Sequence, residues 1–115
     1  MTELRNFLKP DITFSQDLTA AALSYTTTLT RKFRLKNIEF HASVVITETI
    51  TITRDSVNGA AYDTILRKKS LVGEQNYNYD PEKEIVFQAG DKIKITCTNA
   101  NTTGTLYGTI KVQEA

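Results

Sequence analysis

Residues 92–98 read KIKITCT, and residues 105–112 read TLYGTIKV. Apolar and polar side chains alternate without a break in the first segment, and the alternation resumes in the second after the polar segment 99–104. A period of two places successive side chains on opposite faces of an extended backbone, which is typical of a β-strand with one buried face. Together with the apolar residues 85–87, this stretch predicts β-strands joined by polar turns.

Strand-like segments recur on the N-terminal side of this stretch. Residues 49–53 alternate Thr and Ile, and Asn58 and Gly59 follow them, a dipeptide typical of a type I′ hairpin turn. Asn37 interrupts the alternation of residues 33–42, which predicts a β-bulge. The expected strands lie at about 22–29, 33–42, 49–53, 60–66, 75–79, 85–87, 92–98 and 105–112. Short strands with turn signals and no long helix predict an all-β fold, an antiparallel, jelly-roll-like β-sandwich.

The length of 115 residues predicts one domain, which we place at residues 21–115 after an extended N-terminal arm over residues 1–20. The arm carries the apolar residues Phe7, Leu8 and Phe14 without a sustained period. A frayed terminus and an arm docked on a neighbouring subunit both account for this pattern, and a short amphipathic helix is a third alternative. Exposed aromatic side chains on a frayed terminus would favour aggregation, which keeps the docked arm an equal alternative.

Charge and composition argue against several classes of protein. Fourteen Lys and Arg side chains against thirteen Asp and Glu give a net charge of +1, whereas nucleic-acid binding requires clustered positive charge. We therefore expect no direct binding to nucleic acid. The N-terminal sequence has no basic region followed by an apolar one, and no apolar run reaches the length of a membrane span. We expect no contact with a membrane and a chain made in a reducing cytoplasm.

The residues that carry most catalytic and metal chemistry are sparse. His41 is the one histidine, so a zinc site would lack ligands, and no local pattern supplies the partners of a catalytic triad. Cys97 follows the apolar phase of its strand and is expected in the core. The aspartates lack the dense spacing of a calcium loop, although loops of a sandwich can gather calcium ligands. We therefore expect no enzyme activity, no catalytic residue, no cofactor and no metal site.

Two groups of side chains are candidates for contact with a partner. Val44, Val45 and Ile46 fall in an expected connection over residues 43–48; exposed, they would mark a contact surface, and buried, they would continue the strand. Tyr77 and Tyr79 alternate with amides. Together with Tyr62 and Tyr107 they could form a platform that stacks on sugar rings, although the chain has no Trp, and Tyr77 and Tyr79 are the candidate ligand-binding residues. Tyrosines on an outer sheet face are also common where a protein partner packs.

Five segments carry a family resemblance. They are TTTLTRKFRL at 26–35, IEFHAS at 38–43, TITITRDS at 49–56, GAAYD at 59–63 and FQAGDKIKI at 87–95. In this order they resemble small β-sandwich virion structural proteins of tailed bacteriophages and prophages, over about residues 22–113. The resemblance implies a structural role in the virion, as head decoration or as a neck, tail or fibre component.

These observations predict a non-enzymatic virion protein that acts by assembly with itself and with neighbouring virion proteins. The contact residues that we expect are Phe7, Leu8, Phe14, Val44, Val45 and Ile46. The chain would then be a homo-oligomer located in the virion. The alternative from a different class is a carbohydrate-binding or host-recognition module that uses Tyr77 and Tyr79.

Overall fold

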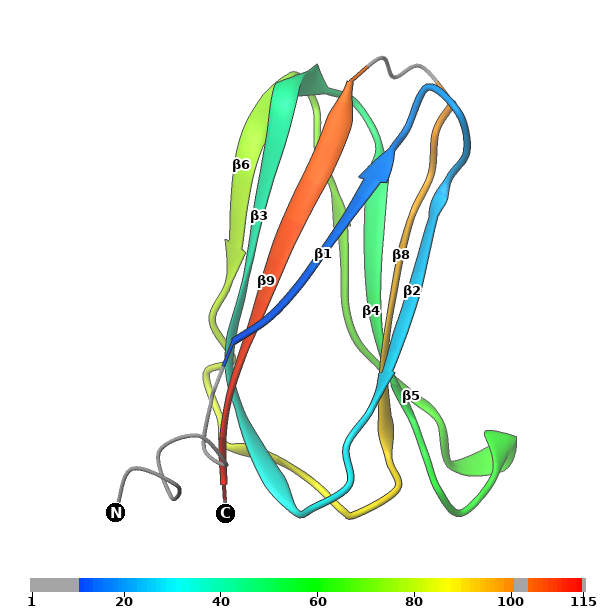
Figure 1. Cartoon of the computed structure of the whole chain (residues 1–115), viewed down its shortest axis with the longest axis vertical. Helices are drawn as coiled ribbons and strands as arrows, with labels where there is room; N and C mark the ends of the chain where they lie inside the picture. Colours follow the sequence, from blue (N-terminus) through cyan, green and yellow to red (C-terminus); the bar gives the residue numbers. More distant parts are fainter. Residues whose placement is uncertain (1–10, 101–103, 115) are drawn as a thin grey trace.

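The computed structural model describes residues 11–100 and 104–114. Within these ranges the chain forms β-strands and one short 3₁₀ helix (Figure 1). Most strands lie where the alternation of side chains predicts them, but the strand at 11–17 was not predicted, and the strand expected at 60–66 lies at 64–70. The elements are β1 (Asp11–Asp17), β2 (Leu23–Thr28), β3 (Phe33–Ile46), β4 (Thr49–Asp55), η1 (Ala60–Tyr62), β5 (Thr64–Ser70), β6 (Glu74–Tyr79), β7 (Ile85–Phe87), β8 (Lys92–Cys97) and β9 (Thr105–Glu114).

The strands build two antiparallel sheets that pack against each other (Figure 1). Sheet A has the order β1-β9-β3-β6, with β7 also paired to β3, and sheet B has the order β2-β8-β4-β5. The pairs are nested along the chain: β1 with β9, β2 with β8, β3 with β6, and β4 with β5. A long antiparallel hairpin wound across two sheets in this way is a jelly roll. The predicted all-β, antiparallel β-sandwich is confirmed.

The core lies between the sheets and comes from alternate residues of each strand. The fully buried isoleucines are Ile38, Ile50, Ile52, Ile93, Ile95 and Ile110. Because β-branched side chains suit a pleated, half-buried surface, these positions favour strands locally and supply the packing between the sheets. Full burial of each such side chain contributes about 1.5–3 kcal/mol, so the same residues account for both the local and the global structure.

The segment 11–17 is not an arm, and here the sequence-based prediction is wrong. It forms strand β1, which pairs with β9 from Asp11 opposite Lys111 to Asp17 opposite Thr105. Phe14 is buried in the core of its own chain, so it is unavailable as the interface residue that the arm predicted. Residues 1–10, which include Phe7 and Leu8, lie outside the described residues.

A glycine on β9 makes room for Phe14. Gly108 is the cross-strand partner of Phe14 on one side and of Phe40 on the other. A Cβ atom on Gly108 would overlap the Phe14 ring. The ring instead stacks on Tyr25, with centroids 4.7 Å apart, and meets Phe40 edge-on at 6.1 Å. The absence of a side chain at Gly108 therefore lets aromatic packing fix β1 to the sandwich.

Strand β3 contains the predicted irregularity and extends further than predicted. Its pairing with β9 shifts register between Leu35 and Asn37, which confirms the β-bulge and allows Leu35 and Ile38 both to face the core. The strand continues to Ile46, and Ile46 is buried with the other core residues. The assignment of Ile46 to a contact surface is therefore wrong, because the register of β3 turns this side chain inward.

The connection between β4 and β5 is longer than the predicted two-residue turn. A type I′ turn needs positive φ at both central residues, but among the described residues only glycines have positive φ, so Asn58 does not. Gly59 has φ of 112° and precedes η1. Asp63 accepts a hydrogen bond from the Ser56 backbone N–H at 2.8 Å, which closes a loop that projects from the lower end of the sandwich in Figure 1.

Candidate functional site

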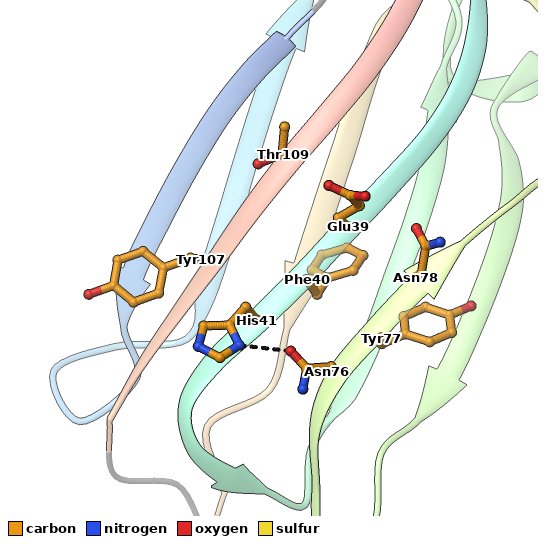
Figure 2. Close-up of a pocket in the computed structure, with 8 residues that line it drawn as sticks. All are labelled: Glu39, Phe40, His41, Asn76, Tyr77, Asn78, Tyr107 and Thr109. Carbon is orange, nitrogen blue, oxygen red and sulfur yellow. Dashed lines mark hydrogen bonds between the residues drawn. The ribbon is translucent and has the colours of Figure 1, made fainter.

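The outward side of sheet A, which we call face A, carries a group of polar and aromatic side chains from β9, β3 and β6. Strand pairing arranges them in two rows of direct neighbours. The first row is Tyr107–His41–Asn76, and the second is Thr109–Glu39–Asn78. Neighbours in a row belong to paired strands about 4.8 Å apart, and the rows are about 6.7 Å apart along the strands. Figure 2 shows the side chains of both rows with the sheet behind them.

These side chains surround a depression of about 590 Å³, the face A hollow. Phe40 and Tyr77 also line it, and their rings stack with centroids 5.9 Å apart. His41 and Asn76 are joined by a hydrogen bond of 2.7 Å between Nδ1 and Oδ1 (Figure 2). The amide oxygen can only accept, so His41 donates from Nδ1 and, in the neutral ring, its Nε2 is an acceptor.

Charge in and around the hollow is largely compensated. Glu39 Oε1 lies 3.4 Å from the Nζ atom of Lys111, which belongs to β9. Asn78 donates from Nδ2 to Asp80 Oδ2 at 2.9 Å. The lining itself is therefore made of hydroxyl, amide, imidazole and aromatic groups and one ion-paired carboxylate. Such a surface can offer several hydrogen bonds without selecting a ligand by net charge.

Tyr77 and Tyr79, the predicted platform, both line a second groove at the edge between β6 and β5, and Tyr77 borders the face A hollow as well. The hydroxyl of Tyr77 accepts a hydrogen bond from Arg67 Nε at 3.0 Å, and Lys69 Nζ lies 6.0 Å from the centre of its ring. Burial raises the pKa of Tyr79 above its usual value, and Tyr77 adds to this while Arg67 opposes it. Tyr77 thus makes contacts within its own chain, and a ligand-binding role for Tyr77 and Tyr79 stays a prediction.

The turns after β3 and β5 meet at the upper end of the sandwich in Figure 1. Leu71 N–H donates to the Glu48 carbonyl at 2.8 Å, and Gly73 N–H donates to Thr47 Oγ1 at 3.1 Å, so the two turns are held together. Val44 and Val45, near the end of β3, are exposed, as is Val72 in the turn after β5. We call these three valines the upper valines.

The opposite end carries a second exposed apolar pair. Val57 and Tyr62 belong to the projecting connection between β4 and β5, and both are more than half exposed. Val57 is held in place because its backbone N–H donates to buried Asp91 at 2.9 Å. We call Val57 and Tyr62 the lower pair. Ile65 is also 62% exposed, but it lies on the outward side of sheet B opposite Thr53.

Buried polar groups close the upper end beneath the valines. Glu48 is 4% exposed and accepts hydrogen bonds from the Thr98 hydroxyl at 2.6 Å and from the Ala100 N–H at 2.9 Å. Cys97 is buried beside it, as its apolar phase predicted. Burial, followed by the nearby Glu48 charge, raises the pKa of the Cys97 thiol to about 12. The thiol is therefore protonated and inert at neutral pH.

The described residues contain neither a cluster of metal ligands nor a helix that could span a membrane. Over residues 11–100 and 104–114, no three or more His, Cys, Asp and Glu side chains are grouped so that they could hold a metal ion. In the same part of the chain, no helix is long and apolar enough to cross a membrane.

Comparisons with known proteins identify no family. No family model and no curated protein matches the chain. The Drosophila NLP core, a structure that addresses pentamer formation and histone binding, gives a TM-score of 0.45 at 13% identity over 90% of this chain and 98% of that one. Infectious bursal disease virus of the Gx strain gives 0.45 at 15% identity over 88% of this chain and 30% of that one.

The VP2 subviral particle of infectious bursal disease virus gives a TM-score of 0.35 at 15% identity, again over 88% of this chain and 30% of that chain. This chain therefore spans less than a third of the viral chains that it is similar to. At TM-scores below 0.5 we take no function from these likenesses.

Proposed function

We propose that the chain is a structural protein of the virion of a tailed bacteriophage or prophage, located in the head decoration, neck, tail or fibre. Its partners are copies of itself and neighbouring virion proteins. The strand-and-turn segments that resemble such proteins support this assignment. Jelly rolls also occur in viral capsid domains, which supports it only by analogy, because one fold hosts many functions.

The observation that carries the proposal is the exposure of apolar side chains at both ends of the sandwich. The upper valines stand on ordered strand and turn backbone, and so does the lower pair at the other end. Solvated apolar side chains grouped on ordered backbone are typical of contact surfaces. Because the two apolar groups lie at opposite ends, the contact that buries both joins the upper end of one copy to the lower end of the next.

Such a head-to-tail contact is heterologous, and a heterologous contact closes into a ring or continues as an open helical array. Rings and tubes are the arrangements that a neck or tail component requires. Phe7 and Leu8 would add to the contact if the first residues dock on a neighbouring copy. Deletion of residues 2–10 tests that part without disturbing β1, and we expect it to lower incorporation into particles.

Light scattering coupled to size exclusion tests the proposed self-association. We expect an oligomer for the wild-type chain and at least tenfold weaker association for the double variant Val44→Ser with Val45→Ser. Ile65→Thr is the matched control, because Ile65 and Val45 are both 62% exposed but Ile65 lies on a sheet face. A monomeric wild-type chain at every concentration, or equal weakening by Ile65→Thr, would contradict the proposal.

A further inference from the structure

Face A differs from an ordinary solvated sheet in the side chains that it presents. Asn is depleted in strands, yet Asn76 and Asn78 occupy two successive outward positions of β6, beside His41 and Glu39 of β3. The outward side of sheet B has rows such as Ser24–Thr96–Thr51–Lys68, in which small hydroxyls and a flexible amine predominate. Solvation alone accounts for that composition, but it does not account for the amides, imidazole and aromatic ring on face A.

The hydrogen-bonding groups of the face A hollow are already oriented. The bond from His41 Nδ1 to Asn76 Oδ1 orients the imidazole, and in the neutral ring Nε2 is then an acceptor. The same bond uses the oxygen of Asn76, so its amide NH₂ remains as a donor. Glu39 accepts, and the Thr109 hydroxyl can do both. Donors and acceptors therefore alternate over two rows of a rigid sheet, and little side-chain entropy is lost when a ligand binds.

A ligand that matches this surface has many neighbouring hydroxyls and no strong charge. The Glu39 carboxylate is paired with Lys111 at 3.4 Å, so neither an anion nor a cation is favoured by the net field of the lining. Tyr107, half exposed at the border of the hollow, offers an apolar ring with a polar tip. The volume of about 590 Å³ is within the range of small-molecule sites, about 300–1,000 Å³.

We propose that the face A hollow binds a neutral saccharide. The C–H face of one sugar ring packs on Tyr107, and the hydroxyls of the saccharide bond to His41, Asn76 and Glu39. This site is distinct from the ends of the sandwich that the assembly proposal uses, and it lies on an outward face that head-to-tail contacts leave open. A result that contradicts one of the two proposals therefore leaves the other unaffected.

The edge groove near Tyr79 is the natural competing location. It is lined by Arg67, Asp80 and Glu82 as well as by Tyr77 and Tyr79. These charged groups fit a neutral sugar less well than the amide, imidazole and aromatic lining of the hollow does. Variants at Tyr107 and Tyr79 separate these two locations directly.

The test begins with an array of neutral oligosaccharides probed with the full chain. The strongest binder is then titrated into ¹⁵N-labelled protein. We expect amide shifts along residues 39–41, 76–78 and 107–109. Tyr107→Ala and Asn76→Ala should each weaken binding at least tenfold, whereas Tyr107→Phe, which keeps the ring, should stay within about threefold. The control Thr96→Ala lies on the outward side of sheet B and should bind as the wild type does.

Three results would overturn the proposal. The first is the absence of any bound neutral saccharide on the array. The second is binding that Tyr107→Ala and Asn76→Ala leave unchanged. The third is a set of shifts centred on Tyr79 and Asp80, with affinity lost in Tyr79→Ala instead. Both test positions are exposed, so the variants fold, and a dispersed spectrum of each variant verifies this.

Discussion

The ends and the faces of this sandwich differ in how they expose apolar side chains. On the faces, strand alternation sends nearly every large apolar side chain into the core and leaves Thr, Lys, Asn and His outside. At the ends, the upper valines and the lower pair remain in solvent although their backbone is held by hydrogen bonds. Exposed apolar groups at turns are not imposed by the fold, because a polar residue would serve a turn as well.

This difference separates what holds the chain together from what it offers to partners. The core residues, such as Phe14 and Ile46, are buried within their own chain. The end residues contribute little to the folded monomer and are free to contribute to an assembly. Substitutions between the sheets should therefore lower stability strongly, and substitutions at the ends should lower it only slightly. Self-association should respond in the opposite way, with the stronger effects at the ends.

The largest expected effect on stability is at Phe14. Phe14→Ala removes a ring that packs on Tyr25, Phe40 and Gly108, and the loss should cost about 3–5 kcal/mol of unfolding free energy. Val45→Ala at the upper end should change the free energy of unfolding by less than about 0.5 kcal/mol. Urea unfolding of both variants measures the contrast. Equal, small losses would mean that β1 is not part of the folded core.

An intermediate effect concerns the buried groups beneath the upper valines. Because the pKa of Cys97 is raised to about 12 from 9.0, the folded state favours the protonated thiol. Its contribution to stability is complete below the unfolded-state pKa and is lost as the pH rises from about 9 toward 12. Wild type should therefore lose more stability over this range than Cys97→Ala does.

At pH 8 a thiol reagent should leave native Cys97 unmodified and react with it after denaturation. Fast labelling of the native protein would show that the upper end opens, which would contradict the view that its valines stand on closed, ordered structure.

A small effect is also expected on face A. The bond between His41 and Asn76 is exposed to solvent, so a double-mutant cycle of His41→Ala and Asn76→Ala should give a coupling of about 0.5–1 kcal/mol. Thr51→Ala with Thr96→Ala, cross-strand neighbours on sheet B, is the matched cycle. A coupling no larger than in the matched cycle would mean that the side chains of face A are not preorganised.

The sequence predicted the strands and the β-bulge at Asn37 because alternation is a local property. It did not predict that β1 belongs to the sandwich, since Phe14 finds its place only opposite Gly108, far along the chain. The prediction of a two-residue turn at Asn58 and Gly59 was wrong, because the hydrogen bond from Ser56 to Asp63 favours a longer loop.

The sequence suggested Tyr107 as one of four tyrosines for sugar stacking, but it did not predict the face A hollow. Tyr107, His41 and Asn76 are distant in sequence and become neighbours only when β9, β3 and β6 pair. Two outward Asn residues in one strand were the local signal that could have indicated this face. Val44 and Val45 were suggested as contact residues because they lie near an expected turn. The sequence did not show that Ile46 is buried while these two valines are exposed, because this depends on the register of β3.

The most direct test of the head-to-tail account is cross-linking between two single variants, Val45→Cys at the upper end and Tyr62→Cys at the lower end. Native Cys97 is buried and its thiol is inert, so a bis-maleimide reagent reports only the introduced thiols. The account predicts a cross-linked dimer in the mixture of the two variants and none in either variant alone. Cross-linking within Val45→Cys alone, or equal yields in all three samples, would contradict it.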